Sequence, residues 1–280
     1  MTTTETLRVA IQGVAGCFHD AAAREYFKGK RIEPVECDTF REMFERLEAD
    51  PEMRGIMAIE NTIAGSLLPN HELLRAGSLR VEGELKMRIS HSLCALPGQS
   101  IDELTEVHSH PMALRQCEQF LRRHRNLRMV EDFDTAGAAR NIASDRRRGA
   151  AAICSSLAAA TYGLEVIESG IETTKHNFTR FLALSHSKST PADIDKASVA
   201  FTLPHTKGAL SKVLAILSFY DLNLTKIQST PIIGREWEYS FYVDLTFDDA
   251  DRYRQAIAAV RPLLTDFRLL GEYRESTQTC

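Results

Sequence analysis

Hydrophobic and polar positions follow two alternating patterns over roughly the first 185 residues. Short apolar runs such as LRVAIQG (7–13) and GIMAIEN (55–61) are typical of buried strands. Between such runs lie stretches with helical spacing, such as TFREMFERLEAD (39–50), where Thr39 can act as an N-cap. Strand followed by helix, repeated, predicts parallel-type sheets covered by helices, and therefore an α/β fold.

The pattern changes after the polar segment SHSKSTPADIDK (185–196), which contains a proline and is typical of a linker. Beyond it the expected order is strand, helix, strand, strand, helix, strand, which is the ferredoxin-like βαββαβ arrangement. We therefore predict two domains, residues 1–185 and 196–280. A module as small as the second one is typical of a sensor or docking unit.

Length and composition agree with this division and exclude several classes of protein. A chain of 280 residues is long enough for two cores. No apolar run approaches the roughly 18 residues that a membrane helix needs, and the N-terminal sequence lacks the features of a signal peptide. A net charge of −4 gives no overall attraction to nucleic acid. We therefore expect a cytoplasmic protein without membrane or nucleic-acid partners, and not a secreted solute-binding protein.

Two sequence features raise the question of a metal or cofactor. HSH (108–110), with Cys117 one helix further on, has the residue types of a metal site. However, Pro111 suits the first position of a helix in which Cys117 falls on the apolar face, so a core cysteine is the preferred interpretation. QGVAG (12–16) is not a G-x-G-x-x-G fingerprint. We expect neither a metal nor a cofactor.

Three polar clusters occur where predicted strands meet helices or begin. In α/β sheets, ligands bind at the carboxyl ends of the strands. IENTIAGS (59–66) is either an anion cradle of side chains and glycine-freed N–H groups or a polar turn. DFDTAG (132–137) is either an anion-binding helix start or an ordinary N-cap formed by Asp134.

The third cluster, NFTRF (177–181), combines a hydroxyl, a guanidinium and an aromatic ring. On a regular strand, Thr179 and Phe181 share one face and Arg180 points to the other. At a strand end, the backbone could turn all three toward one cleft, where Thr179 would donate a proton and Arg180 would hold a carboxylate. The alternative is an edge strand with a surface arginine.

These clusters, together with SHPMALRQC (109–117) and the βαββαβ tail, resemble the prephenate dehydratases over about residues 7–275. The resemblance implies a two-lobed catalytic unit similar to type 2 periplasmic binding proteins, with its active site in the cleft. It also implies a C-terminal ACT domain that binds L-phenylalanine and a homodimer or homotetramer. The implied activity is that of a lyase of L-phenylalanine biosynthesis, which converts prephenate to phenylpyruvate under feedback regulation.

The resemblance assigns roles to individual residues. Thr179 matches the family's catalytic threonine, with Glu60 and Asn61 as its partners, and Phe181 would exclude water. The substrate-binding residues it implies are Arg180, Phe181, Thr62, Ser66, Thr135 and Ala136. The effector-binding residues it implies are Gly208, Ala209, Leu210, Asn223, Gln228 and Ser229.

This chain departs from the family at two sites, and two other functions stay open. Val14 and Cys17 replace a proline and a hydroxyl residue in the first glycine turn. In the tail, the usual Glu-Ser-Arg-Pro run reads QSTP (228–231), which loses a charge pair. The alternatives are an arogenate dehydratase, whose substrate carries an amine in place of the ketone, and a non-catalytic amino-acid sensor.

Overall fold

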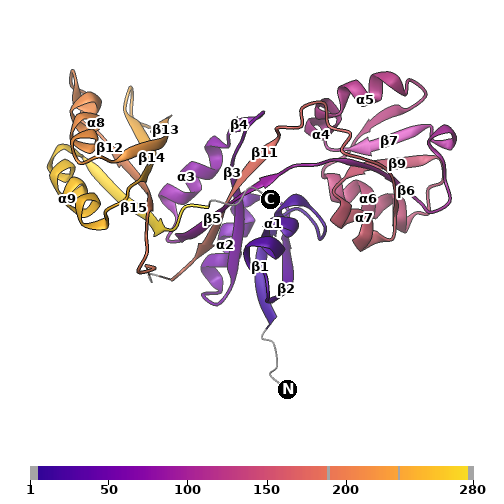
Figure 1. The fold of residues 1–280 in the computed structure, drawn as a ribbon, viewed down its shortest axis with the longest axis horizontal. Coiled ribbons are helices and arrows are strands. Elements are labelled where there is room, and N and C mark those ends of the chain that lie inside the picture. Colours follow the sequence, from indigo (N-terminus) through magenta and orange to yellow (C-terminus); the bar gives the residue numbers. More distant parts are fainter. Residues whose placement is uncertain (1–5, 188–189, 233, 277–280) are drawn as a thin grey trace.

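The computed structural model describes residues 6–187, 190–232 and 234–276, and it contains three sheets (Figure 1). A first lobe stands in the middle, with a second lobe on one side and a C-terminal domain on the other. The chain leaves the first lobe after β5, builds the second lobe, and returns along β11. The residues between β11 and β12 include the expected linker, of which 188–189 lie outside the described residues.

The first lobe is a mixed sheet with strand order β2-β1-β3-β11-β5. Strands β1, β2 and β3 are parallel, as predicted, whereas β11 is antiparallel to both β3 and β5 because it returns from the other lobe. Its elements are β1 (Thr6–Gln12), α1 (Phe18–Tyr26), β2 (Arg31–Cys37), α2 (Phe40–Ala49), β3 (Arg54–Asn61), β4 (Gly65–Ser66), α3 (Leu68–Ala76), β5 (Arg80–Arg88) and β11 (Phe178–Ser185).

The second lobe has strand order β10-β6-β9-β7-β8, and only β7, β8 and β9 are mutually parallel. The helix expected after Pro111 is interrupted at Cys117, which is fully buried as predicted. The elements are β6 (Ser92–Ala95), a 3-10 turn (Ile101–Glu103), β7 (Glu106–Ser109), α4 (Pro111–Gln116), α5 (Glu118–Arg123), β8 (Arg128–Glu131), α6 (Thr135–Ser144), β9 (Ala150–Cys154), α7 (Ser156–Tyr162) and β10 (Glu165–Ser169).

The two lobes share a core beneath the loop that precedes α1. Gly16 has a φ of +84°, and a Cβ atom there would lie 2.7 Å from the Cα of Ala158 on α7. Only glycine allows this approach without strain. The Ser155 hydroxyl donates to the Gly16 carbonyl at 2.6 Å, and the Tyr162 hydroxyl donates to the Ala15 carbonyl at 2.7 Å. The loop therefore joins the lobes on one side of the molecule.

The C-terminal domain is an antiparallel sheet with order β13-β14-β12-β15, which is the predicted βαββαβ arrangement. Alternate residues of its strands pack under α8 and α9, while the other face packs against the first lobe. A Cβ atom on Gly271 would lie 2.1 Å from the Val81 carbonyl, so β15 and β5 touch closely. The elements are β12 (Lys196–Thr202), α8 (Ala209–Phe219), β13 (Asn223–Pro231), β14 (Tyr239–Thr246), α9 (Ala250–Val260), a 3-10 turn (Arg261–Leu263) and β15 (Asp266–Tyr273).

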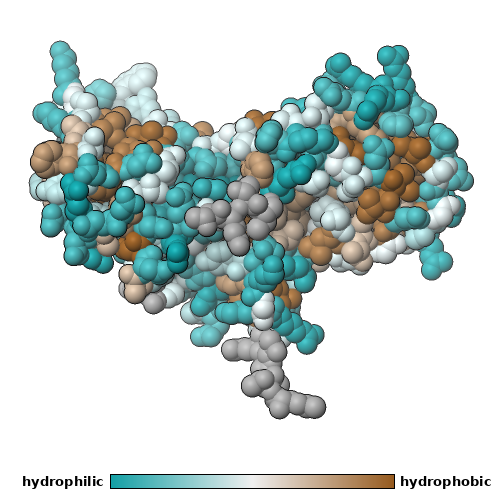
Figure 2. Space-filling model, in the orientation of Figure 1, coloured by the Kyte–Doolittle hydropathy of each residue, from teal (hydrophilic) through white to brown (hydrophobic). Residues whose placement is uncertain are grey.

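The surface is largely hydrophilic on the face shown in Figure 2, with hydrophobic residues gathered over the second lobe and over the C-terminal domain. Phe219 and Trp237 of the C-terminal domain are each more than 70% exposed. Among the described residues, none of the helices is both long enough and apolar enough to cross a membrane.

Candidate active site

The ends of β3 and β11 bring together residues that lie more than 110 positions apart in the chain. Thr179 pairs with Asn61 and Arg180 with Glu60, but Phe181 pairs with Ala58, so β3 carries one extra residue, Ile59. A bulge of this kind re-aims the side chains that follow it. As a result, Asn61 meets Thr179 on one face of the strand pair, and Glu60 meets Arg180 on the other.

The Asn61 amide is oriented by the backbone around it. Its Oδ1 accepts from the N–H groups of Ile63 and Ala64, both at 2.9 Å, so its Nδ2 must face the other way. There Nδ2 donates to Thr179 Oγ1 at 2.9 Å. Because the Thr179 oxygen accepts this hydrogen bond, its own hydroxyl proton is left to be donated elsewhere.

A hydrogen-bond chain extends from this pair into the second lobe. Asn61 Nδ2 also donates to Asn177 Oδ1 at 2.8 Å, and Asn177 Nδ2 donates to Gln116 Oε1 at 3.1 Å. His91 Nε2 approaches the same oxygen at 2.8 Å, and burial lowers the pKa of His91, which favours the neutral ring. Gln116 and His91 were not singled out from the sequence, although Gln116 lies within the SHPMALRQC motif.

Arg180 lies on the face opposite Thr179 and points toward the C-terminal domain. Its guanidinium donates to Glu84 at 2.6 Å, to Glu60 at 3.2 Å, to the Tyr273 hydroxyl at 3.1 Å, and also to Asp244. Arg180 and Thr179 both line one cavity at the strand ends, but the guanidinium is bound by protein groups. With its donors committed to protein groups, Arg180 has no geometric support as the main anchor of a substrate carboxylate.

Glu60 is also held by cations rather than directed at Thr179. One carboxylate oxygen accepts from Arg180, and the other accepts from Lys226 of the C-terminal domain. Burial alone would raise the pKa of Glu60, but Lys226 and Arg180 outweigh it and leave the pKa below its usual range. The carboxylate is therefore ionised at neutral pH, and it contacts Arg180 and Lys226 rather than Thr179, its expected partner.

Phe181 is buried in the core of the first lobe instead of facing a cleft. It is 1% exposed, and its ring packs edge-on against His19 with centroids 5.2 Å apart. The expectation that Phe181 excludes water from the substrate site is therefore wrong in position. Phe178, three residues earlier, lies at the strand end where that role could be filled.

Thr62 and Ser66 serve the surrounding loops. The Thr62 hydroxyl donates to the His176 carbonyl at 3.1 Å and accepts from the Phe178 N–H at 2.9 Å, which fixes the segment that enters β11. The Ser66 hydroxyl accepts from Lys226 at 2.8 Å. Both residues lie close to the Thr179–Asn61 pair, but Ser66 faces the C-terminal domain.

Thr135 and Ala136 open α6, where Asp134 is the N-cap as predicted and accepts from the Gly137 N–H at 3.0 Å. Ala136 is fully buried. Asp134 also accepts from the backbone N–H groups of Val14 and Thr135, and burial raises its pKa. The start of α6 is therefore committed to the first glycine turn, and neither Thr135 nor Ala136 lines the cavity beside Thr179.

A cavity of about 420 Å³ opens at the ends of β3, β5 and β11. Thr179, Asn61 and Thr62 contribute to its wall, and so does Lys86, whose side chain is 38% exposed and whose ammonium group forms an ion pair with Glu275 at 3.3 Å. Lys86 was not predicted from the sequence. The remaining lining residues are Glu60, Phe178 and Arg180.

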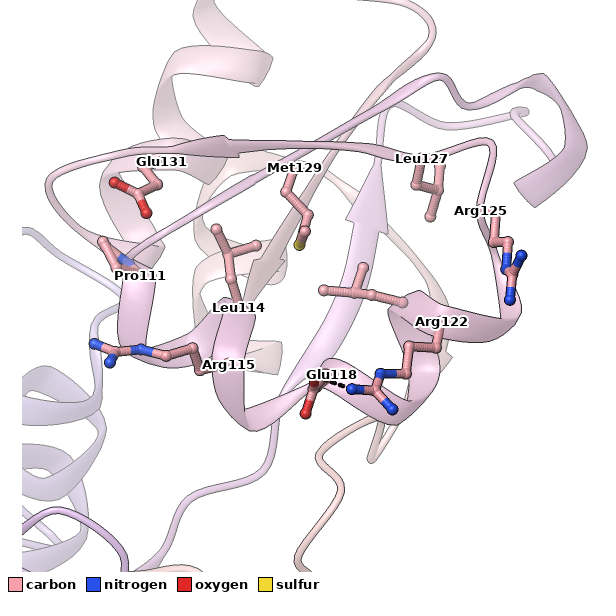
Figure 3. A pocket seen from close by; sticks show the side chains of 10 residues that line it. Pro111, Leu114, Arg115, Glu118, Arg122, Arg125, Leu127, Met129 and Glu131 are labelled. Atoms are coloured by element: carbon pink, nitrogen blue, oxygen red, sulfur yellow. Dashed lines mark hydrogen bonds and ion pairs between the residues drawn. The ribbon is translucent and has the colours of Figure 1, made fainter.

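A larger groove, about 1030 Å³, lies elsewhere, on the outside of the second lobe. Figure 3 shows Leu114 of α4 and Met129 of β8 on opposite sides of it, with Arg115, Arg122 and Arg125 nearby. None of the residues predicted for the active site lines this groove, so size alone does not identify the site. Among the described residues, no group of three or more His, Cys, Asp or Glu side chains is arranged to hold a metal ion.

The predicted effector residues fall into two groups. Gly208 adopts a φ of +77° before α8, and Ala209 and Leu210 line a small cavity of about 140 Å³ with His205. Asn223 lies beyond the other end of α8, at the start of β13. Asn223 and Gly208 therefore do not form one binding site within a single chain. Gln228 and Ser229 lie further along β13, and Ser229 pairs with Phe241 at the edge of that cavity.

Known proteins match this chain over most of its length. A family model described as prephenate dehydratase matches residues 9–189. The chain is 37% identical to arogenate dehydratase/prephenate dehydratase 6, chloroplastic, of Arabidopsis thaliana, in an alignment that covers 95% of this chain and 68% of that protein.

Two solved structures share the whole fold. Prephenate dehydratase from Arthrobacter aurescens, in complex with L-Phe, has a TM-score of 0.87 at 27% identity and covers 98% of this chain and 92% of its own. GqqA, described as a novel type of quorum quenching acylase, has a TM-score of 0.87 at 28% identity and covers 96% of this chain and 98% of its own.

Proposed function

The chain belongs to the prephenate dehydratase family, and from that premise we propose that it converts prephenate to phenylpyruvate, carbon dioxide and water. The observation that carries the proposal is the Thr179 hydroxyl, whose oxygen accepts from Asn61 beside a cavity that Lys86 also lines. The reaction serves L-phenylalanine biosynthesis. Aromatisation of the ring drives it, and the loss of water and carbon dioxide requires no redox partner.

Thr179 donates its hydroxyl proton to the leaving hydroxyl of the ring. As the C–O bond breaks and the ring carboxylate leaves as carbon dioxide, the electrons of the broken C–C bond complete the aromatic ring. Threonine is a weak acid, so the Asn61 amide must stabilise the negative charge that grows on the Thr179 oxygen. The N–H of Asn61 already points at that oxygen, which means that little reorganisation is required during the reaction.

Lys86 binds a carboxylate of the substrate, which competes for its ammonium group with Glu275, the ion-pair partner of Lys86 at 3.3 Å. A lysine at the mouth of the cavity can hold the side-chain carboxylate while leaving the ring carboxylate loosely bound. Loose binding is favourable for the group that departs, because ground-state stabilisation would slow its loss. Phe178 covers the apolar ring.

Arogenate is the second candidate substrate, and one observation bears on it. Glu60 lines the cavity and could attract the arogenate amine. However, both its oxygens already accept hydrogen bonds from cations, Arg180 on one and Lys226 on the other, so it offers little uncompensated negative charge. This arrangement favours the ketone of prephenate over the amine.

An acylase activity, as named for GqqA, has less support in the geometry. Acyl transfer through a threonine needs a base that takes the hydroxyl proton. Here the hydrogen-bond partner of Thr179 Oγ1 is the donor side of the Asn61 amide. Asn61 can stabilise an oxygen but cannot accept its proton.

The C-terminal domain is an ACT-type sensor for L-phenylalanine in this proposal, supported by the L-Phe complex of the Arthrobacter protein. Asn223 and Gly208 lie at opposite ends of α8, so one effector could contact both only across two copies of the domain. β13 is an edge strand, and Ile227 on it is 45% exposed. Such an edge is suited to pairing with a second copy, and we propose a homo-oligomer.

A cytoplasmic location is proposed on the chemistry of the cysteines. The five cysteines within the described residues are all unpaired and buried, which is usual in a reducing compartment.

The test is the turnover of prephenate and arogenate by the purified protein without added cofactor. We expect phenylpyruvate from prephenate over many turnovers, and a slower formation of phenylalanine from arogenate. An acyl-homoserine lactone is the control substrate for acylase activity. Binding of phenylalanine without turnover of any substrate would overturn the proposal and support a sensor.

A further inference from the structure

Two rows of polar side chains face each other where the C-terminal domain meets the first lobe. Across the C-terminal sheet, Asp244 on β14 pairs with Lys226 on β13 and with Ser198 on β12. Across the first lobe, Arg180 on β11 pairs with Glu60 on β3. Arg180 donates to Asp244, and Lys226 donates to Glu60. Each row therefore contains one cation and one anion, and each of them pairs with the opposite charge in the facing row.

Three of these four charged side chains are almost fully removed from water, whereas that of Glu60 is 33% exposed. The side chain of Asp244 is 0% exposed, and those of Arg180 and Lys226 are 6% and 8% exposed. A buried charge is tolerated only when partners satisfy it, and leaving one unpaired is costly. Ser198 and Tyr273 complete the set: the Ser198 hydroxyl donates to Asp244, and the Tyr273 hydroxyl accepts from Arg180 at 3.1 Å.

The strand residues next to this cluster carry the chemistry. Thr179 precedes Arg180 on β11, and Asn61 follows Glu60 on β3. Neighbouring residues of a strand point to opposite faces, so Asn61 and Thr179 contact each other on one face, while Glu60 and Arg180, which also line the cavity, contact the C-terminal domain on the other. A shift of Arg180 or Glu60 would therefore change the position of Thr179 relative to Asn61.

We propose that Asp244 and Lys226 of the C-terminal domain are positioning residues for the reaction proposed above. They hold Arg180 and Glu60, and through them they fix the 2.9 Å contact between Asn61 Nδ2 and Thr179 Oγ1. The inference rests on the proposed function for its kinetic consequence, but the structural restraint itself stands apart from it. The catalytic strand pair is thus completed by a domain that contributes nothing to the cavity wall.

The alternative is that these contacts only hold the two domains together. Arg268 can distinguish this alternative from a positioning role. Arg268 on β15 donates to the carbonyls of Arg75, at 2.7 Å, and of Gly77 at the end of α3. It therefore ties the same two domains together without touching β3 or β11. Loss of Arg268 weakens docking but leaves the Arg180–Glu60 pair in place.

The experiment compares Asp244→Asn and Lys226→Gln with Arg268→Ala in the full chain. We expect kcat to fall about tenfold or more in Asp244→Asn and about threefold or more in Lys226→Gln, with KM within about threefold of wild type, because positioning is lost rather than binding. Arg268→Ala keeps kcat within about twofold. Lys226→Gln alone decides the matter if Asp244→Asn does not fold.

A second measurement does not depend on the substrate. Hydrogen exchange of peptides covering residues 58–64 and 176–182 is expected to speed up about fivefold in Asp244→Asn and in Lys226→Gln but not in Arg268→Ala. Unchanged kcat and exchange in the folded Asp244→Asn and Lys226→Gln proteins would overturn the proposal, as would equal losses of kcat in Arg268→Ala. If the wild type turns over neither prephenate nor arogenate, the proposed function fails, and exchange alone decides on positioning.

Discussion

Thr179 shows how one hydrogen bond assigns a role to a side chain. Its oxygen accepts from an amide whose orientation is fixed by two backbone N–H groups, so its proton is available to a substrate. We expect Thr179→Val to lower kcat by about 10²- to 10⁴-fold, the range typical of a lost proton donor. Thr179→Ser keeps the hydroxyl and is expected to retain activity within about tenfold. Steady-state kinetics on prephenate would contradict the assignment if the valine variant kept the kcat of the serine variant.

Arg180 leads to a prediction about stability rather than binding. Arg180→Met removes a cation that contacts Asp244, Glu84 and Glu60, and it leaves two fully buried carboxylates short of a partner. The expected loss in the free energy of unfolding is about 3–5 kcal/mol. Arg46→Met is the matched control, because Arg46 pairs with Glu42 on an exposed helix face and its loss should cost far less. Equal shifts of the urea midpoint in the two variants would contradict this.

The sequence named both Asn61 and Glu60 as partners of Thr179, and the structure joins Thr179 to Asn61. The motifs named both strand ends, and alternation along a strand already put Arg180 opposite Thr179. The remaining information was long-range. It depends on the extra residue Ile59 in β3, and on a C-terminal domain that supplies Asp244 more than 60 residues later. Neither feature has a local pattern in the sequence.

At the scale of elements, the strand and helix order was predictable because it follows from local periodicity. The antiparallel direction of β11 was not, because it depends on the chain leaving the first lobe and returning. The interruption between α4 and α5 at Cys117 was also missed, since Leu114, Cys117 and Leu121 keep helical spacing across it. All three residues are nevertheless buried, so the apolar spacing predicted the core correctly.

The turn before α1 gives a prediction at the same scale. Gly16 and Gly29 both have positive φ, of +84° and +90°, but only Gly16 lies against another element, the helix α7. Gly29→Ala should cost about 1 kcal/mol from backbone strain alone. Gly16→Ala adds a clash with Ala158, which raises the cost by roughly 1–3 kcal/mol. Thermal unfolding of both variants measures the difference, and equal melting temperatures would show that the loop can move away from α7.

Over the whole molecule, the charged interface makes the docking of the C-terminal domain sensitive to acid. Burial would raise the pKa of Asp244, but Arg180 and Ser198 outweigh it and keep the pKa below its usual range, as Lys226 does for Glu60. A carboxyl group with a depressed pKa in the folded state stabilises that state above its unfolded pKa, near 4, and loses this contribution as pH falls through the folded value.

His71 acts in the same direction at higher pH. Its ring packs edge-on against Tyr242 of the C-terminal domain, with centroids 4.5 Å apart, and burial lowers its pKa. The neutral ring contributes stability above its unfolded pKa, about 6.5, and that contribution declines as pH falls below it. Two windows are therefore expected: a shallow loss of stability below about pH 6.5 and a steeper one below about pH 4.

These two windows can be assigned separately by mutation. Urea unfolding between pH 3 and pH 8 should show both in the wild type. His71→Phe keeps an aromatic ring against Tyr242 and should reduce the loss below about pH 6.5 without removing it, because burial also lowers the pKa values of His19 and His91, while the loss due to the carboxylates should stay. In Asp244→Asn the steep loss should weaken, since Asp244 no longer has a proton to gain, and stability at pH 7 should already be lower because Arg180 has lost a partner. If acid destabilised Asp244→Asn as steeply as wild type, the acid response would come from groups outside this interface.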